Sequence, residues 1–370
     1  MSSRDADAAV VRNRILGSYR DVGNGKTSGK STPPSPPTDF LDTVLAPKVG
    51  AILYSTTFLG AKEHLSKSGQ PDIDITSLMH DVSDWPTTDQ EFIPDVDVNY
   101  LWQHDVLYPA LCGILKGMKM LTVGPTGSGK TTFHENLAGT FRQPYYRLGG
   151  RGDMESDTIL GRQDIQNGTM DFLLGEFTKA YVNGYYILLD EIWKLPSNIN
   201  MVFQRVFERN GLLQIDDARG DLKDKQFHPG ATTILQLADN VVGTGDGADK
   251  YAATMIQDGS TINRMDMILH LDYLKPTDEV TMLLNRFGSF LPAHMATKCV
   301  QVANLIRDGF TGNEVSATMS PRNLFTWLEM AQEVRSYETA FSWTMLQRYA
   351  DDNERSAIAG FYATVFGKSL

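Results

Sequence analysis

The stretch VGPTGSGKTTF, residues 123–133, limits the folds open to this chain more than any other feature. It contains GPTGSGKT, Gly124–Thr131, which fits the pattern G-x-x-x-x-G-K-[ST] in full. The apolar run KMLTV precedes it, and the helix-forming run TTFHENLAGTF follows it. Glycines let backbone N–H groups curl around phosphate oxygens, and the following helix adds the positive end of its dipole. The sequence therefore predicts a strand, a phosphate-binding loop and a helix.

The side chains of this loop have separate predicted roles. Lys130 is expected to reach the outer phosphates of ATP, and the Thr131 hydroxyl to bind Mg²⁺. The predicted nucleotide contacts are Gly124, Pro125, Thr126, Gly127, Ser128, Gly129, Lys130, Thr131 and Thr132. The alternative is a Gly-rich turn with a purely structural role.

A second motif, YYILLDE at residues 185–191, is an apolar run that ends in two acids. A strand of this kind puts Asp190 at the carboxyl edge of a parallel sheet, where ligands bind. We expect Asp190 to hold Mg²⁺ through its water shell and Glu191 to polarise a water for attack on the γ-phosphate. Such a carboxylate favours hydrolysis over a small-molecule kinase. The alternative is a pair of acids that stabilises the first turn of a helix.

Short apolar runs alternate with helical stretches from Tyr100 to Tyr273, which predicts an α/β fold with buried parallel strands. We place this α/β nucleotide-binding domain at residues 100–275 and an all-helical domain at 276–370, with Gly288 and Gly309 as helix stops. Residues 1–39 are rich in Pro, Ser and Gly and are expected to form a flexible tail. Residues 40–99 form a small N-terminal region without an assigned role.

The net charge of -11 and the pI near 5.1 argue against non-specific binding to DNA or RNA. The two cysteines, Cys112 and Cys299, are far apart, which excludes a disulfide framework and fits a reducing cytoplasm. No apolar run approaches the ~18 residues of a membrane span, and the start MSSRDADAAVVRN lacks the apolar core of a signal peptide. We therefore expect a cytoplasmic protein without a membrane association.

Two further stretches carry a resemblance to a known family. ILQLADNVVGTGDGADKY (234–251) and STINRMDMILHLDYLKPTDEV (260–280) are similar to the ATPase subunit of cobaltochelatase, which belongs to the MoxR group of AAA+ ATPases. The likeness covers about residues 92 to 330. It implies an AAA+ P-loop core followed by a small helical lid.

The resemblance also implies roles for three residues. Asn240 corresponds to sensor 1, which fixes the attacking water, and Arg264 to the arginine finger that completes a neighbouring subunit's site. Arg322, in the motif SPRN, corresponds to sensor 2. From the residues alone, Asn240 could be a turn residue, Arg264 a solvated charge, and SPRN a helix start. The family usually has Asp where this chain has Asn263.

At the level of assembly, the resemblance implies a homo-oligomeric ring, a hexamer, with ATP bound between subunits. Hydrolysis would remodel a client protein beside a partner with a von Willebrand factor A domain. A helicase-type motor stimulated by nucleic acid is the competing hypothesis, and the acidic composition argues against it. A nucleotide-dependent scaffold without hydrolysis is a third, which Glu191 opposes.

Local patterns predict four further features. Asn167-Gly168 is a preferred hairpin turn within residues 162–172, and a second hairpin is expected around residues 212–227. We expect His134 on a helix surface and His270 in a strand core, and neither has the spacing of a metal ligand.

Overall fold

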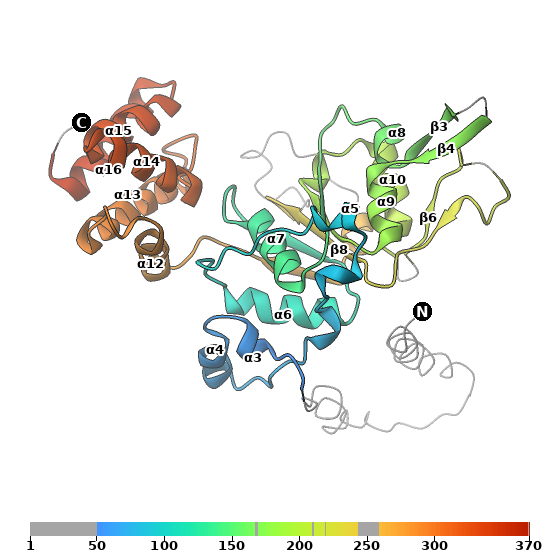
Figure 1. Ribbon diagram of the computed structural model, residues 1–370. Helices are drawn as coiled ribbons and strands as arrows, with labels where there is room; N and C mark the ends of the chain where they lie inside the picture. The colour runs from blue at the N-terminus through green and yellow to red at the C-terminus, as the bar shows by residue number, and fades with distance from the viewer. Residues whose placement is uncertain (1–49, 167–168, 209–210, 219, 243–258, 369) are drawn as a thin grey trace, which may run out of the picture. The chain divides into compact units, whose positions relative to one another are not determined.

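The computed structural model describes residues 50–166, 169–208, 211–218, 220–242, 259–368 and 370 (Figure 1). The chain separates into two compact units, residues 1–78 and 79–370. In the first, the described elements are α3 (Tyr54–Thr57), α4 (Ala61–Ser68) and the 3₁₀ helix η1 (Thr76–Leu78). Gly69 ends α4 in the left-handed conformation, and its N–H donates to Leu65 O, as is common at helix ends.

Five parallel strands form the central sheet of the second unit, in the order β2-β5-β8-β1-β9. They are β1 (Met120–Val123), β2 (Tyr145–Gly149), β5 (Tyr186–Asp190), β8 (Ile234–Asp239) and β9 (Met267–His270). Every residue of β1, β5 and β8 is buried, which explains their nearly continuous apolar sequences.

Helices flank this sheet, as Figure 1 shows. The longer ones are α6 (His104–Leu115), α7 (Lys130–Phe141), α9 (Glu176–Asn183) and α10 (Ser197–Val206). The shorter ones are η2 (Val82–Asp84), α5 (Thr87–Gln90), α8 (Ser156–Ile159), η3 (Ile192–Lys194) and α11 (Gly259–Ile262). The predicted α/β fold class is confirmed.

The strand register aligns the carboxyl ends of four strands. Gly149 of β2 lies opposite Asp190 of β5, and Asp190 lies opposite Ala238 of β8. Val123 of β1 lies opposite Asp239 of β8. The loop after β1, the acid that ends β5 and the residues after β8 therefore share the edge where open α/β sheets bind ligands.

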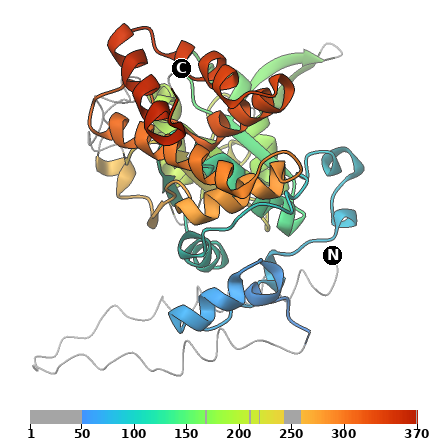
Figure 2. The same ribbon diagram turned by 90° about the vertical axis from the view of Figure 1, so that its left-hand side faces the viewer.

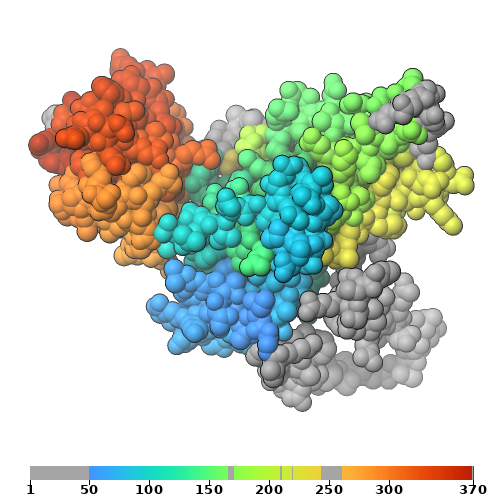
Figure 3. Space-filling view, in the orientation of Figure 1, coloured from blue at the N-terminus to red at the C-terminus, as the bar shows by residue number. Residues whose placement is uncertain are grey.

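Two antiparallel strand pairs stand where hairpins were expected. β3 (Gly161–Gln166) pairs with β4 (Thr169–Leu174), and β6 (Leu213–Gln214) pairs with β7 (Gln226–Phe227). Figure 3 shows both pairs at the surface. A hydrogen bond of 3.0 Å connects the two pairs: the side-chain amide of Gln163 in β3 donates to Asp217 O, which lies between β6 and β7 in the chain. The predicted strand pairings are confirmed, while the turn residues Asn167 and Gly168 lie outside the described residues.

The C-terminal part is helical throughout its described length and gathers into one bundle (Figure 2). Its elements are α12 (Pro276–Phe287), α13 (Ala293–Thr311), α14 (Pro321–Val334), α15 (Tyr337–Thr344), η5 (Leu346–Arg348) and α16 (Asp352–Phe366). Trp327 is fully buried at its centre, with its ring centroid 4.8 Å from that of Phe341. The predicted all-helical region is confirmed.

One of the two predicted helix stops is wrong. Gly288 caps the C-terminus of α12 as expected, but α13 runs past Gly309 and ends at Gly312.

The expected positions of two histidines are reversed. His134 is only 1% exposed, and its ring nitrogens lie 2.9 Å from Thr122 Oγ1 and 2.7 Å from Tyr186 Oη. His270 is exposed, because β9 is an edge strand. Burial lowers the pKa of His134 from 6.5 to about 3, so the folded chain holds this imidazole neutral.

This burial predicts a measurable pH dependence of stability. From about pH 6.5 down to about pH 3 the unfolded chain binds a proton that the folded chain refuses, so His134 lowers stability as the pH falls. We expect His134→Gln to reduce the slope of the unfolding free energy against pH by about 1.4 kcal/mol per unit. Urea unfolding over that pH range measures it, with His270→Gln as the exposed control. Equal slopes in wild type and His134→Gln would contradict the expectation.

Candidate functional site

The loop between β1 and α7 has the geometry of a phosphate-binding loop. Gly127 and Gly129 take φ values of 74° and 97°, in the left-handed region that glycine adopts without strain. The Lys130 ammonium donates to the carbonyl oxygens of Gly124 at 2.8 Å and Pro125 at 3.0 Å, and to Asn240 Oδ1 at 2.9 Å. Three neutral oxygens thus hold the charge that would face phosphate.

Lys130 is buried, and burial lowers its pKa to about 8, against the opposing pull of Asp190, Asp239 and Glu191. An ammonium with a depressed pKa gains more from an anionic ligand than a solvated one does, because the ligand replaces lost hydration. The buried Ser128 Oγ has no hydrogen-bond partner among the described residues. Both features fit a loop that binds an anion.

Asp190 ends β5 with its side chain 5% exposed. Its Oδ2 accepts a hydrogen bond from Thr131 Oγ1 at 2.8 Å, so the two predicted Mg²⁺ ligands are already adjacent. The same oxygen accepts from Arg147 of β2, through Nε at 2.9 Å and Nη2 at 2.7 Å. Sequence reasoning missed Arg147, because only the strand order reveals that β2 lies beside β5.

Glu191 follows Asp190 with φ 53°, an uncommon left-handed conformation for a residue with a side chain. Gly150 fits closely against it: its N–H donates to Asp190 O at 2.7 Å, and a Cβ there would lie 2.2 Å from Glu191 O. The Glu191 carboxylate is 40% exposed and lies 3.0 Å from Lys194 Nζ. It is therefore oriented but accessible to water.

Asp239 is the last residue of β8, and Asn240 follows it. Asp239 is buried, and its carboxylate accepts from the backbone N–H groups of Asn240 at 2.7 Å and Trp193 at 3.0 Å. Burial raises the pKa of Asp239. This carboxylate fixes the turn that aims Asn240 at Lys130, a role that the sequence analysis did not assign.

The two predicted arginines come from other elements. Arg264 lies between α11 and β9, with its Nε 4.0 Å from Glu208 Oε1. Arg322 is exposed in the first turn of α14, and no hydrogen bond or ion pair of its guanidinium occurs among the described residues. Ser320, just before α14, packs on the phosphate loop so closely that a Cβ at Gly127 would lie 2.4 Å from Ser320 Cβ. This contact brings the start of α14, and Arg322 with it, to the phosphate loop.

Comparison with known proteins places this site in a family. Residues 119–280 match the family described as AAA domain (dynein-related subfamily). The aerobic cobaltochelatase subunit CobS of Sinorhizobium sp is 27% identical over 75% of this chain and 84% of its own. The protein YojN of Bacillus subtilis is 33% identical over 70% of this chain and 82% of its own. The chain belongs to the MoxR-type AAA+ family. The family match also makes it a P-loop NTPase.

Among solved structures, the RuvB Holliday junction branch migration motor of Thermotoga maritima aligns over 71% of this chain and 75% of its own. The TM-score is 0.41 and the sequence identity 14%. At that level the alignment adds nothing to the argument about function.

The site of this MoxR-type chain fits a magnesium nucleotide. No cluster of three or more His, Cys, Asp or Glu that could hold a metal occurs in the described parts of the chain. Mg²⁺ does not need one, since it is commonly held by one or two protein oxygens together with waters and substrate phosphates. Thr131 Oγ1 and Asp190 Oδ2, which lie 2.8 Å apart, are oxygens of this kind. None of the helices in the described parts of the chain is long and apolar enough to cross a membrane.

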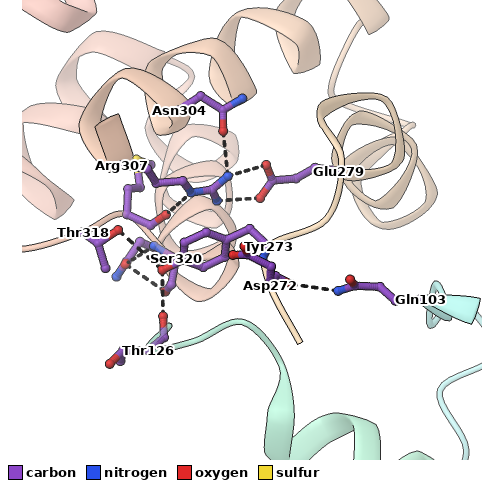
Figure 4. A network of polar contacts seen from close by, with 11 residues as sticks. Gln103, Thr126, Asp272, Tyr273, Glu279, Asn304, Arg307, Thr318 and Ser320 are labelled. Atoms are coloured by element: carbon purple, nitrogen blue, oxygen red, sulfur yellow. Dashed lines mark hydrogen bonds and ion pairs between the residues drawn. The ribbon is translucent and has the colours of Figure 1, made fainter. Parts of the chain in front are cut away.

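A polar network joins the phosphate loop to the helical region (Figure 4). The Tyr273 hydroxyl donates to Thr126 O at 2.9 Å, and the Arg307 guanidinium lies 4.2 Å from the centre of the Tyr273 ring. Arg307 forms a two-pronged ion pair with Glu279 and donates from Nε to Met319 O at 2.7 Å. Sequence reasoning missed these residues, because each partner comes from a different segment.

Proposed function

We propose that this MoxR-type AAA+ protein binds and hydrolyses ATP at the subunit interfaces of a ring, a hexamer, to remodel or activate a partner protein. The observation that carries the proposal is the meeting of Lys130, Thr131, Asp190 and Asn240 at one edge of the sheet through bonds of 2.8–2.9 Å. We retain the division into an α/β domain at residues 100–275 and a lid at 276–370 as part of the proposal, together with a cytoplasmic location.

In this mechanism, Mg²⁺ would neutralise charge on the β- and γ-phosphates, held by Thr131 and by Asp190 through water. Lys130 exchanges the carbonyl oxygens of its own loop for phosphate oxygens. Glu191 accepts a proton from the attacking water, and Asn240 orients that water. The exposure of the Glu191 carboxylate to solvent favours transfer of the γ-phosphoryl group to water over transfer to a small-molecule acceptor.

The remaining proposed roles lie between subunits and between domains. Arg264 acts as the finger that stabilises charge in a neighbour's site. Arg322 acts as sensor 2, and the packing of Ser320 on Gly127 supports that role, since the start of α14 lies beside the phosphate loop. Loss of the γ-phosphate would then move the lid relative to the sheet.

The client is proposed from the relatives. CobS is named as a subunit of an aerobic cobaltochelatase, so a chelatase-like large subunit or a partner with a von Willebrand factor A domain is the first candidate. Affinity capture with Glu191→Gln in ATP, read by mass spectrometry, identifies the client. Capture must be lost in Lys130→Met, because that variant lacks the charge that holds the nucleotide.

Mixing two inactive variants tests the shared site. Lys130→Met disables a subunit's own site but keeps its Arg264, whereas Arg264→Ala keeps the site and loses the finger. In randomly mixed rings with head-to-tail interfaces, about a quarter of the sites combine an intact loop with an intact finger. We expect about a quarter of wild-type ATP turnover on mixing. Turnover no higher than that of the separate variants would contradict the assignment of Arg264 as a finger that acts in a neighbouring subunit. In a separate measurement, strong stimulation of wild-type ATP turnover by DNA would favour the helicase hypothesis.

A further inference from the structure

Arg147 occupies the carboxylate oxygen that the proposed mechanism reserves for Mg²⁺. Its Nε and Nη2 both donate to Asp190 Oδ2, at 2.9 and 2.7 Å. Thr131 Oγ1 donates to that same oxygen at 2.8 Å, so Oδ2 already accepts three hydrogen bonds. The guanidinium therefore occupies the Oδ2 side of the carboxylate, which is also the side that faces Thr131, the other proposed Mg²⁺ ligand.

The ion pair is not needed to hold the two strands together. β2 and β5 pair over five consecutive residues, from Tyr145 opposite Tyr186 to Gly149 opposite Asp190. This backbone ladder fixes the register without help from a side chain. The charge of Arg147 must therefore be explained by the carboxylate it faces rather than by the sheet.

The side chains of the two partners differ in burial. The Asp190 side chain is 5% exposed, whereas that of Arg147 is 49% exposed. An almost fully buried carboxylate is costly to leave unpaired, while a half-exposed arginine can turn toward water at little cost. The pair is therefore asymmetric: Asp190 stays in place, and Arg147 is the member that can leave.

We propose that Arg147 is a resident counter-ion of Asp190 that competes with Mg²⁺ and so sets the magnesium concentration at which the nucleotide binds tightly. This inference rests on the proposed function. Without metal, Arg147 neutralises Asp190 and prevents the carboxylate from repelling the phosphates. When Mg²⁺ arrives with the nucleotide, Arg147 yields Oδ2, because the guanidinium and the metal ion repel each other when both lie against the same oxygen. Arg147 is thus a positioning residue that acts through Asp190.

The test measures binding rather than turnover. The dissociation constant of a fluorescent ADP analogue is determined for the full chain in EDTA and over a magnesium titration, for wild type, Arg147→Met, Arg147→Lys and Arg151→Met. Arg151 is the matched control, since its side chain is 72% exposed and forms only a long ion pair, 3.7 Å, with the exposed Asp153.

Arg147→Met should shift two quantities in opposite directions. We expect weaker binding in EDTA, because Asp190 is left uncompensated, and half-maximal magnesium enhancement at about a tenfold lower concentration, because one charge-assisted pair no longer competes. Arg147→Lys, which keeps the charge but not the fork, should fall between wild type and Arg147→Met. Arg151→Met should match wild type.

The contradicting outcomes are distinct. Binding weakened by the same factor with and without Mg²⁺ would make Arg147 a phosphate ligand and overturn the inference. A magnesium response unchanged in Arg147→Met would refute the inference alone. If the dissociation constant of the ADP analogue for the wild-type chain did not change with the Mg²⁺ concentration, the proposed function would be refuted as well.

Discussion

Replacing Glu191 with Gln should lower the rate of ATP hydrolysis by a factor on the order of 10² to 10⁴, the range that a positioned general base contributes. ATP binding should persist, because the contacts that would hold the phosphates come from Lys130 and the loop rather than from Glu191. The change is isosteric and preserves the left-handed backbone at this position. Single-turnover hydrolysis measures the rate, and fluorescence titration measures the affinity.

The control for this variant is Glu176→Gln, the same chemical change at an exposed position in the first turn of α9. It should leave hydrolysis unchanged. If Glu191→Gln hydrolysed ATP as fast as wild type, the water would have to be activated elsewhere, and the assignment of Glu191 would fail. If it lost ATP affinity in parallel with rate, Glu191 would instead be part of the binding site.

Local sequence predicted the centre of the site, because its parts are contiguous in the chain or end a strand. Lys130 and Thr131 come from one motif, and Asp190 ends an apolar run. Asn240 also follows an apolar run, but its role came only from the family resemblance. Parallel strands bring such ends to one edge whatever their order, so the meeting of these side chains could be expected before the order was known.

Residues that depend on strand order or on helix packing could not be predicted in this way. Arg147 matters because β2 lies next to β5, and no short pattern states which strands are neighbours. His134 is buried because its helix face packs on Thr122 and Tyr186, although the helix's local sequence gave no sign of this.

The buried pair of Arg307 and Glu279 leads to the second large expected effect. Their side chains are 9% and 0% exposed, and the guanidinium meets both carboxylate oxygens at 2.7 and 2.8 Å. Removing one member of such a pair leaves a buried charge without compensation, at a cost of about 3–5 kcal/mol. We therefore expect Glu279→Met and Arg307→Met each to lower the free energy of unfolding by about that amount, measured by urea denaturation without nucleotide.

The double variant distinguishes the penalty of leaving one buried charge unpaired from the net contribution of the ion pair to stability. With both charges replaced by apolar side chains, as in Glu279→Met with Arg307→Met, no unpaired charge remains, and the loss should be clearly smaller than the sum of the single losses. Strict additivity would contradict this account and place each residue in a separate role.

The same pair should also affect the nucleotide loop, because Arg307 lies over Tyr273, whose hydroxyl binds Thr126 O. We expect the double variant to bind ATP more weakly than wild type even where it is well folded. The Arg307 guanidinium no longer stacks on Tyr273, so the tyrosine that holds Thr126 of the loop has lost its support. Exposed Arg286, which pairs with Glu329 on the surface, provides the matched control: Arg286→Met should change stability by less than about 1 kcal/mol and leave ATP affinity unaltered.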